Sequence, residues 1–594
     1  MSIIRVLISI GFIFGVESWC GAATWFVRPG VWTTVNATTG HPIPTAGVYG
    51  LQNGTDYADA WNGLTSIVWG PGGVSSNDTL YVCGTHIYKI QFMVGAVNAQ
   101  AVTLIGSSHL TIRMDWPGDP GTLFGGCLNF HGAGAPCAGP DSNGVYNQKL
   151  LSTATPPPVF YIQVTNGSTN IIRLEHRNAA SWTDKLGGQY LNGTTNYVQL
   201  PDGTVPATND VAIGSEGWAF DLNYQSNITF QSCHFIAMNA QSGGLGAIRH
   251  TVPVLPYTAA ANNITFTNCT SFDSTEFYLY PGENNFSLLS CEVARTPTAI
   301  YGLLNGTVNA PNNITVSNCW IHDIGTPEYN DVDNNAVGIQ GGNYHLITRN
   351  TFSNTGGAVI MWTGAVNMRS NIVSYNFVLN TMTNSSGSSD AIAIGGLNSS
   401  ATPGYRIGNQ IFGNIIRNCE VVSGDSLSGY GIDLNTPDYT PVYNNTIYGG
   451  SCAINWQVVI SNCPVNAKIV NNVIVLPSVR YYYIVGSSPP TNLVVDYNLY
   501  YPAAALAGTA TVYPRCTVDA HSVFSNPVFV SATPAGASDF RLSYNSPAIQ
   551  AGMALGLLWD FAGMPIPTNV PPDIGAYQFV FSQLVTPTNL HIVP

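Results

Sequence analysis

Acidic side chains gather in one short stretch in the middle of the chain and recur in two later segments. Asp331 and Asp333 lie in GTPEYNDVDNNAVGIQGG, Asp390 in SSDAIAIGG and Asp433 in GYGIDLN. Paired carboxylates serve as general acid and base in glycoside hydrolysis, or as hard oxygen ligands for Ca²⁺. We therefore predict that these four aspartates are catalytic, and that Asp331 and Asp333 are candidate Ca²⁺ ligands. The alternative is that Asp331 and Asp333 cap a turn, which is a common use of aspartate.

Two basic side chains are candidates for proton transfer. Arg249, in the segment AIRH, is a candidate base or partner of a substrate carboxylate, and His322, in WIHD, is a candidate general base. The sequence contains only four lysines, and none of them precedes Lys468 in the central part of the chain. The alternative for His322 is structural, a hydrogen bond to Asp323 at the end of a strand.

Aromatic and amide side chains alternate with apolar ones in short segments such as AVGIQGG (336–342) and AIAIGG (391–396). Because successive side chains of a strand face opposite sides, the apolar set predicts a core face and the other set an outer face. Such an outer face suits sugar rings and hydroxyl groups, and an exposed Trp362 would be costly without a ligand. The alternative is that a long loop covers Trp362. The predicted substrate-binding residues are Tyr301, Gln340, Trp362, Asn435, Asn455 and His250.

A repeated phrase indicates the elements that must position these side chains. Short runs of alternating β-branched residues end in asparagine eight times, at intervals of 26 to 50 residues, and this period is typical of a solenoid. We predict about ten stacked coils of a parallel β-helix, in which each amide hydrogen-bonds its neighbours above and below. The eight asparagines are Asn268, Asn318, Asn350, Asn376, Asn414, Asn445, Asn472 and Asn498. Cysteines directly after four such phrases, at Cys233, Cys269, Cys291 and Cys319, are expected to be small apolar core residues on the other face.

The pattern divides the chain into five parts. Residues 1–23 carry Arg5, an apolar run and small residues before Thr24, which predicts a cleaved secretory signal peptide. The other parts are the N-terminal segment and first coils (24–175), a small β insertion (176–214), the central parallel β-helix (215–505) and a C-terminal cap (506–594). One of the first coils is expected in FYIQVTNGSTNIIRLEHRN.

Composition limits the partners and the location. The net charge is −13 and charged residues make up 8% of the chain, which argues against nucleic acid as a partner. No second apolar stretch of membrane-spanning length follows the signal, so we expect a secreted or extracellular protein without a transmembrane segment. The repetitive, amide-rich stack is also compatible with lateral or end-to-end self-association.

The repeated coils and the ending DFRLSYNSPAIQAG (539–552) with PPDIGAYQF (571–579) resemble the secreted bacterial right-handed parallel β-helix proteins of the pectate-lyase-like superfamily. The resemblance implies a right-handed parallel β-helix over nearly the whole mature chain. In lyases of this superfamily a Ca²⁺ ion neutralises the uronate carboxylate while an Arg or Lys removes the C5 proton. Gln550 and Gln578 stand where the family ending has acids, which suggests adaptation to acidic surroundings, where protonated carboxylates would cost stability.

Two hypotheses follow, because the superfamily contains both enzymes and adhesins and its fold does not imply one activity. The first is an exported, carbohydrate-active protein, a polysaccharide lyase or glycoside hydrolase that binds its polymer along a lateral groove of the central coils. The second is a non-catalytic extracellular structural protein, such as an adhesin or a filament or surface-layer subunit. Apart from Ca²⁺, we expect no cofactor.

Overall fold

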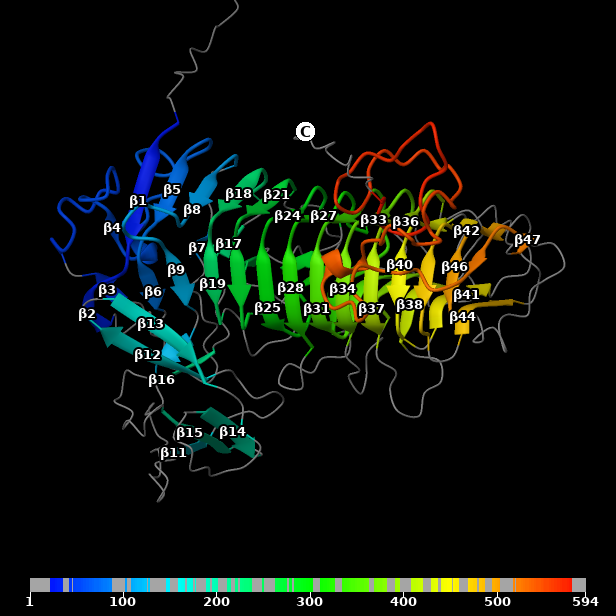
Figure 1. Cartoon of the computed structure of the whole chain (residues 1–594). Coiled ribbons are helices and arrows are strands. Elements are labelled where there is room, and N and C mark those ends of the chain that lie inside the picture. Colours follow the sequence, from blue (N-terminus) through cyan, green and yellow to red (C-terminus); the bar gives the residue numbers. More distant parts are fainter. Residues whose placement is uncertain are drawn as a thin grey trace, which may run out of the picture.

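The computed structural model describes strands and turns throughout most of the chain, and one stack of parallel strands dominates it (Figure 1). The described residues are 22–35, 42–44, 46–87, 102–103, 108–124, 126–128, 146–149, 159–165, 168–174, 177, 188–192, 195–200, 211–214, 220–222, 225–237, 248–249, 262–274, 277–279, 282–302, 310–325, 334–362, 368–381, 390–395, 407–419, 429–435, 440–450, 452–458, 468–477, 480–486, 494–502, 517–518 and 520–579. Within them, no helix is long and apolar enough to cross a membrane.

Three long parallel sheets run along the molecule. The first sheet contains, in spatial order, β4 (Trp61–Asn62), β1 (Thr24–Arg28), β5 (Thr79–Val82), β8 (Thr111–Arg113), β18 (Ile228–Gln231), β21 (Ile264–Thr267), β24 (Ser287–Leu289), β27 (Thr315–Ser317), β30 (Leu346–Thr348), β33 (Ile372–Ser374), β36 (Gln410–Phe412), β39 (Val442–Tyr443), β42 (Lys468–Val470), β45 (Val494–Asp496) and β47 (Thr517–Val518).

The second sheet contains β6 (Thr85–Ile87), β9 (Thr122–Phe124), β19 (His234–Ile236), β22 (Thr270–Phe272), β25 (Glu292–Thr296), β28 (Trp320–Ile324), β31 (Thr351–Thr355), β34 (Phe377–Thr381), β37 (Ile415–Cys419), β40 (Thr446–Tyr448), β43 (Val473–Val475), β46 (Leu499–Tyr501) and β48 (Val523–Phe524). The third sheet contains β23 (Phe277–Leu279), β26 (Ile300–Gly302), β29 (Asn335–Gln340), β32 (Gly357–Trp362), β35 (Ile392–Gly395), β38 (Tyr430–Asn435), β41 (Cys452–Val458) and β44 (Arg480–Gly486).

Each central coil gives one strand to each sheet, as β27, β28 and β29 do before β30, β31 and β32 begin the next coil. The apolar residue of each strand points inward, so that Val316, Ile321 and Val337 of one coil are all fully buried. The fold is therefore the predicted all-β parallel β-helix, and the alternation of β-branched residues is its cause.

A file of buried asparagines follows the turn between the first and second sheets. The backbone N–H and the side-chain amide of Asn350 both donate to Oδ1 of Asn376, each at 3.0 Å. The amide of Asn350 also donates to the carbonyl of Val316 at 2.9 Å. The same pattern links Asn376, Asn414, Asn445, Asn472 and Asn498. Every buried amide in this file is thus hydrogen-bonded, as predicted.

The file continues with cysteines where two of the eight asparagines were expected. The N–H of Cys319 donates to Oδ1 of Asn350 at 2.9 Å, and Cys233, Cys269 and Cys291 precede Cys319 in the same file. Asn268 and Asn318 lie one position earlier, are exposed, and have φ angles of 54° and 55°. The prediction for these two asparagines was therefore wrong, because asparagine also recurs where the turn needs a left-handed residue, a conformation that it tolerates well.

Antiparallel strands form an insertion beside the early coils (Figure 1). One sheet contains β10 (Gly126–Leu128), β16 (Val211–Gly214), β12 (Val159–Thr165) and β13 (Ser168–Arg173); another contains β11 (Tyr146–Lys149), β15 (Thr195–Gln199) and β14 (Gly188–Asn192). The coil expected in FYIQVTNGSTNIIRLEHRN is thus wrong, since β12 and β13 pair as an antiparallel hairpin. The Asn-Gly pair between them is the strongest short hairpin signal.

Smaller elements complete the N-terminal part. β7 (Val102–Thr103), β17 (Phe220–Asp221) and β20 (Ile248–Arg249) form a short parallel sheet, and β2 (Trp32–Val35) pairs with β3 (Pro42–Pro44). A 3₁₀ turn, η1 (Leu64–Ser66), follows β4. Thr24, the first residue after the predicted signal peptide, begins β1, whereas residues 1–21 lie outside the described residues.

The C-terminal segment, residues 520–579, folds back along the stack and contains the 3₁₀ turn η5 (Ala537–Phe540). Figure 1 shows its orange and red trace beside β34, β37 and β40. Phe540 and Tyr577 pack with Phe377 and Ile415 of the second sheet. This segment therefore covers the outer face of the second sheet from β34 onward.

Candidate functional site

The outer face of the third sheet holds most of the described residues that were predicted to bind substrate. In β29 the core-facing Val337 and Ile339 are fully buried, whereas Gln340 is partly exposed on the other side. Gln340 lies opposite Trp362 of β32, and Tyr301 of β26 lies opposite Gly338. Period-2 alternation therefore places Tyr301, Gln340 and Trp362 on one face in consecutive coils.

Tyr301, Gln340 and Trp362 are in contact with one another. The side-chain amide of Gln340 donates to the hydroxyl of Tyr301 at 2.6 Å, and the Tyr301 and Trp362 rings have centroids 6.1 Å apart with planes inclined by 57°. Gly338 leaves room for this arrangement, because a Cβ there would lie 3.3 Å from the Trp362 ring. The three side chains form a partly exposed aromatic and amide cluster, which we call the third-sheet cluster.

Three more predicted residues continue along the same face. Asp433 lies opposite Ala393 on one side and Asn455 on the other, and Asn435 lies opposite Gly395, the partner of Trp362. Asp433 is partly exposed, and its strand neighbours Ile432 and Leu434 are fully buried. By register, Asp433, Asn435 and Asn455 therefore belong to the face that carries the third-sheet cluster.

Asp390 does not belong to this face. It precedes β35 at the corner between the second and third sheets and is only 8% exposed. Its Oδ1 accepts the backbone N–H of Tyr430, in the next coil, at 3.0 Å. The structure therefore places Asp390 in a contact between coils and away from the outer face that carries Asp433, and its catalytic role stays a prediction.

The remaining predicted residues are placed elsewhere or not described. Arg249 lies in β20, which pairs with β17 of the short parallel sheet and not with a described strand of the third sheet. His250, Asp331 and Asp333 lie outside the described residues, so the predicted Ca²⁺ ligands stay a prediction. Within the described residues, no group of three or more His, Cys, Asp and Glu side chains is arranged to hold a metal ion.

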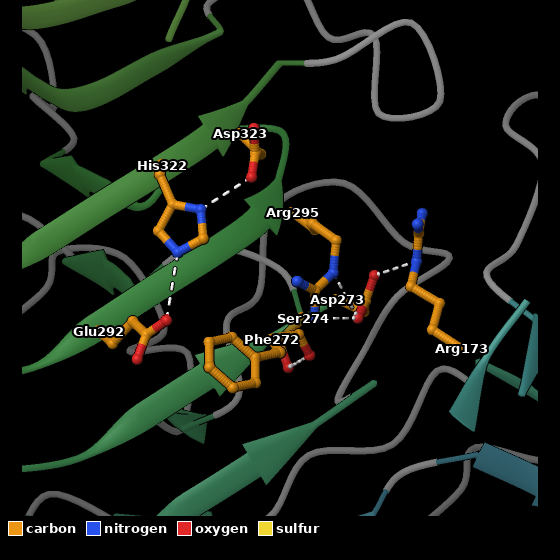
Figure 2. Close-up of polar contacts among 8 residues, drawn as sticks. All are labelled: Arg173, Phe272, Asp273, Ser274, Glu292, Arg295, His322 and Asp323. Carbon is orange, nitrogen blue, oxygen red and sulfur yellow. Dashed lines mark hydrogen bonds and ion pairs between the residues drawn. The ribbon is translucent and has the colours of Figure 1, made fainter. Parts of the chain in front are cut away.

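His322 lies on the second sheet, where two carboxylates hold its ring (Figure 2). Nδ1 lies 2.7 Å from Oδ2 of Asp323, and Nε2 lies 3.2 Å from Oε1 of Glu292 in the preceding coil. Both ring nitrogens thus face carboxylate oxygens, and these two contacts fix the orientation of the imidazole ring. The hydrogen bond to Asp323 that the structural alternative predicted is thus present, and His322 does not share a face with Asp433.

A second charged group lies at the ends of neighbouring strands (Figure 2). The fully buried carboxylate of Asp273 forms an ion pair with Arg173 of β13 at 2.7 Å. It also accepts Nε–H of Arg295 at 3.0 Å and lies 2.9 Å from Nη2 of the same residue. The Arg295 guanidinium lies 5.0 Å from the centroid of the Phe272 ring. This group therefore joins the antiparallel insertion to the coils.

The sequence contains a signal for four further residues that were not predicted, Glu292, Trp320, Asp273 and Arg295. Asp273, Arg295 and Asp323 each lie four residues after a cysteine of the buried file, and all three have a positive φ. Glu292 and Trp320 each lie one residue after such a cysteine. Aligning the phrases on cysteine instead of asparagine would have placed these side chains in adjacent coils.

Comparison with known proteins adds no family: no protein-family model matches the chain, and neither does any curated protein.

Proposed function

We propose that this protein is an exported, carbohydrate-active member of the pectate-lyase-like superfamily that binds a polysaccharide along the outer face of the third sheet. The contact among Tyr301, Gln340 and Trp362 carries the proposal. Aromatic rings pack on the apolar faces of sugars, and amide groups both donate to and accept from hydroxyl groups.

The arrangement of this face suits a polymer more than a single sugar. Neighbouring strands are roughly 4.8 Å apart, and the outer residues repeat at that spacing parallel to the long axis. A saccharide chain laid along the axis would meet the third-sheet cluster first and then Asp433, Asn435 and Asn455 in the following coils. Several weak contacts with successive coils would then combine into a measurable affinity for the polymer.

Cleavage of the bound polymer is the second part of the proposal. Asp433 offers a carboxylate on the same face, two strands from Trp362, for general acid or base catalysis. Hydrolysis would need a second carboxyl group, whereas β-elimination would need a base together with a group that neutralises the uronate. Asp331 and Asp333 are the proposed source of that second group, directly or through Ca²⁺.

The test is a panel of neutral and acidic polysaccharides offered to the mature protein, with and without Ca²⁺. Unsaturated products that absorb in the ultraviolet would identify a lyase, and new reducing ends without that absorbance would identify a hydrolase. Asp433→Asn should abolish cleavage while binding persists, and Trp559→Ala, on the C-terminal segment, is the matched control. Binding without cleavage would favour the adhesin alternative, and failure to bind any polysaccharide would overturn the proposal.

A further inference from the structure

Within the described residues, the outer face of the second sheet is covered at one end and open in its middle. From β34 onward the C-terminal segment packs on it, and Phe377 at the edge of that contact is only 8% exposed. At the other end, the ion pair between Arg173 and Asp273 joins the insertion to the end of β22. Between these two contacts lie β25, β28 and β31.

Trp320 of β28 lies in this open stretch with 48% of its surface exposed. Its indole stacks on the His322 ring, with centroids 4.0 Å apart and planes inclined by 23°. Glu292 and Asp323 hold that imidazole from both sides. The indole therefore rests on a support whose orientation is fixed, which is the preorganisation that a binding platform needs.

Polar side chains surround this indole. Trp320 lies opposite Glu292 in the coil before it and opposite Thr351 in the coil after it, and Thr270 extends the row by one more strand. The Glu292 side chain is 34% exposed, so the carboxylate that orients His322 also faces solvent. An aromatic face with a carboxylate and hydroxyl groups beside it has the composition of a saccharide subsite.

We infer that Trp320 is the platform of a second saccharide-binding site, on the second sheet and separate from the third-sheet cluster. The charge of the site selects the ligand. Glu292 and Asp323 place two carboxylates beside the indole and its supporting ring, so an acidic sugar is disfavoured and a neutral oligosaccharide fits. This inference goes beyond the proposed function and does not depend on it, because the residues of the two sites lie on different sheets.

The test uses isothermal titration calorimetry of the mature protein with cello-, xylo- and manno-oligosaccharides as probes. All titrations are made on a Trp362→Ala background, which weakens binding at the third-sheet cluster, so that the difference between Trp320→Ala and Trp559→Ala reports on the second sheet. On that background one of these neutral oligosaccharides should bind, and Trp320→Ala should weaken binding by about tenfold or more. Trp320→Phe should retain part of the affinity, because it keeps an aromatic ring on His322.

Trp559→Ala is the matched control, because Trp559 is 46% exposed but lies on the C-terminal segment, away from the stack on His322. It should leave the affinity unchanged. The inference is overturned if no neutral oligosaccharide binds on the Trp362→Ala background, or if Trp320→Ala and Trp559→Ala bind equally well. It is also overturned if light scattering shows a dimer that Trp320→Ala dissociates, since a second copy of the chain would then cover the indole. These outcomes are independent of whether the third sheet binds or cleaves a polymer.

Discussion

Cys319 and Asn350 occupy the same position in consecutive coils: the backbone N–H of Cys319 donates to Oδ1 of Asn350 at 2.9 Å. On one side of this contact the file contains asparagines that bond through their amides, and on the other side it contains cysteines whose thiols accept backbone N–H groups at 3.3–3.4 Å. Both residue types thus satisfy the same backbone group at the same turn.

An internal asparagine of the file should matter far more than an exposed one at the preceding position. Asn414→Ala removes the acceptor of two donors from Asn376, and it also removes an amide that bonds Val373, Phe412 and Asn445. We expect the free energy of unfolding to fall by about 3 kcal/mol, since buried donors would lose their partner. Denaturant unfolding followed by circular dichroism measures this change.

Asn318→Gly is the control for this substitution, because Asn318 is exposed with a positive φ that glycine also adopts. It should change the free energy of unfolding by less than about 1 kcal/mol, because glycine adopts a positive φ without steric cost. Equal effects of the two substitutions would contradict the assignment of Asn414 to a buried file.

The buried thiols should be unreactive in the folded protein. Burial raises the pKa of Cys83 and of Cys419 to about 12, so the thiolate that reacts with alkylating agents is scarce at pH ~8. Peptide mapping after treatment with iodoacetamide should find both cysteines unmodified in the native protein and modified after unfolding in guanidinium. Rapid modification of either one in the native protein would show that these coils open readily.

Asp273 should be essential for holding the insertion on the coils. Asp273→Asn keeps the shape and tolerates the positive φ of 52°, but it leaves Arg173 and Arg295 without their shared countercharge. Removing one partner of a buried ion pair costs about 3–5 kcal/mol. We therefore expect the free energy of unfolding, measured by denaturant titration, to fall by this order. Asp115→Asn is a suitable comparison, since the Arg113–Asp115 pair is about one-third exposed and should contribute about 1 kcal/mol or less. A smaller effect at Asp273 than at Asp115 would refute the role of this pair.

The C-terminal segment should be more stable at mildly acidic pH than at neutral pH. Burial raises the pKa of Asp560 and of Asp573 above the ordinary value of a carboxyl group. A carboxyl with a raised pKa in the folded state binds its proton more tightly there, so its contribution to stability is present at low pH and lost as pH rises. Asp115, Asp496 and Asp539 have lowered pKa values and act in the opposite sense. Arg113 donates to Asp115, hydrogen bonds from His521 and Tyr497 outweigh burial at Asp496, and two backbone N–H groups donate to Asp539 in the C-terminal segment.

Gln578→Glu tests this directly. Gln578 is buried; its side-chain oxygen accepts the backbone N–H of Asp573 at 2.9 Å, and its backbone N–H donates to the carboxylate of Asp560 at 3.0 Å. A third carboxylate there would be buried beside two others, so the variant should melt earlier at pH ~7 and regain the parent melting temperature near pH ~4, where carboxyl groups protonate. Calorimetric scans across this range measure the effect, and a difference that stays constant with pH would refute it. A melting temperature that recovers at acidic pH would also support the suggested adaptation to acidic surroundings.

The sequence contained enough information for the architecture and for part of the site. Period-2 alternation in the third-sheet strands correctly placed Tyr301, Gln340 and Trp362 on one face, because a strand has no other way to arrange successive side chains. The spacing of Asn350 and the later asparagines correctly predicted a hydrogen-bonded file. Both results depend on local rules that repeat in every coil.

Other features depend on contacts that no local pattern contains. The burial of Asp390 follows from its place at a corner between two sheets, where its carboxylate accepts a backbone N–H from the next coil. The Arg173–Asp273 ion pair joins residues 100 positions apart across the insertion, a pairing that follows from how the hairpin packs. The Asn-Gly signal in that hairpin was available, but the β-branched residues around it also fitted a coil.

The affinity of the protein for a polysaccharide, compared between Trp362→Ala and Trp559→Ala, tests the proposed binding face most directly. If the outer face of the third sheet binds the polymer, Trp362→Ala should weaken binding by about tenfold, because the indole loses its stacking contact, and Trp559→Ala should have no effect. Equal affinities of the two variants would contradict the account.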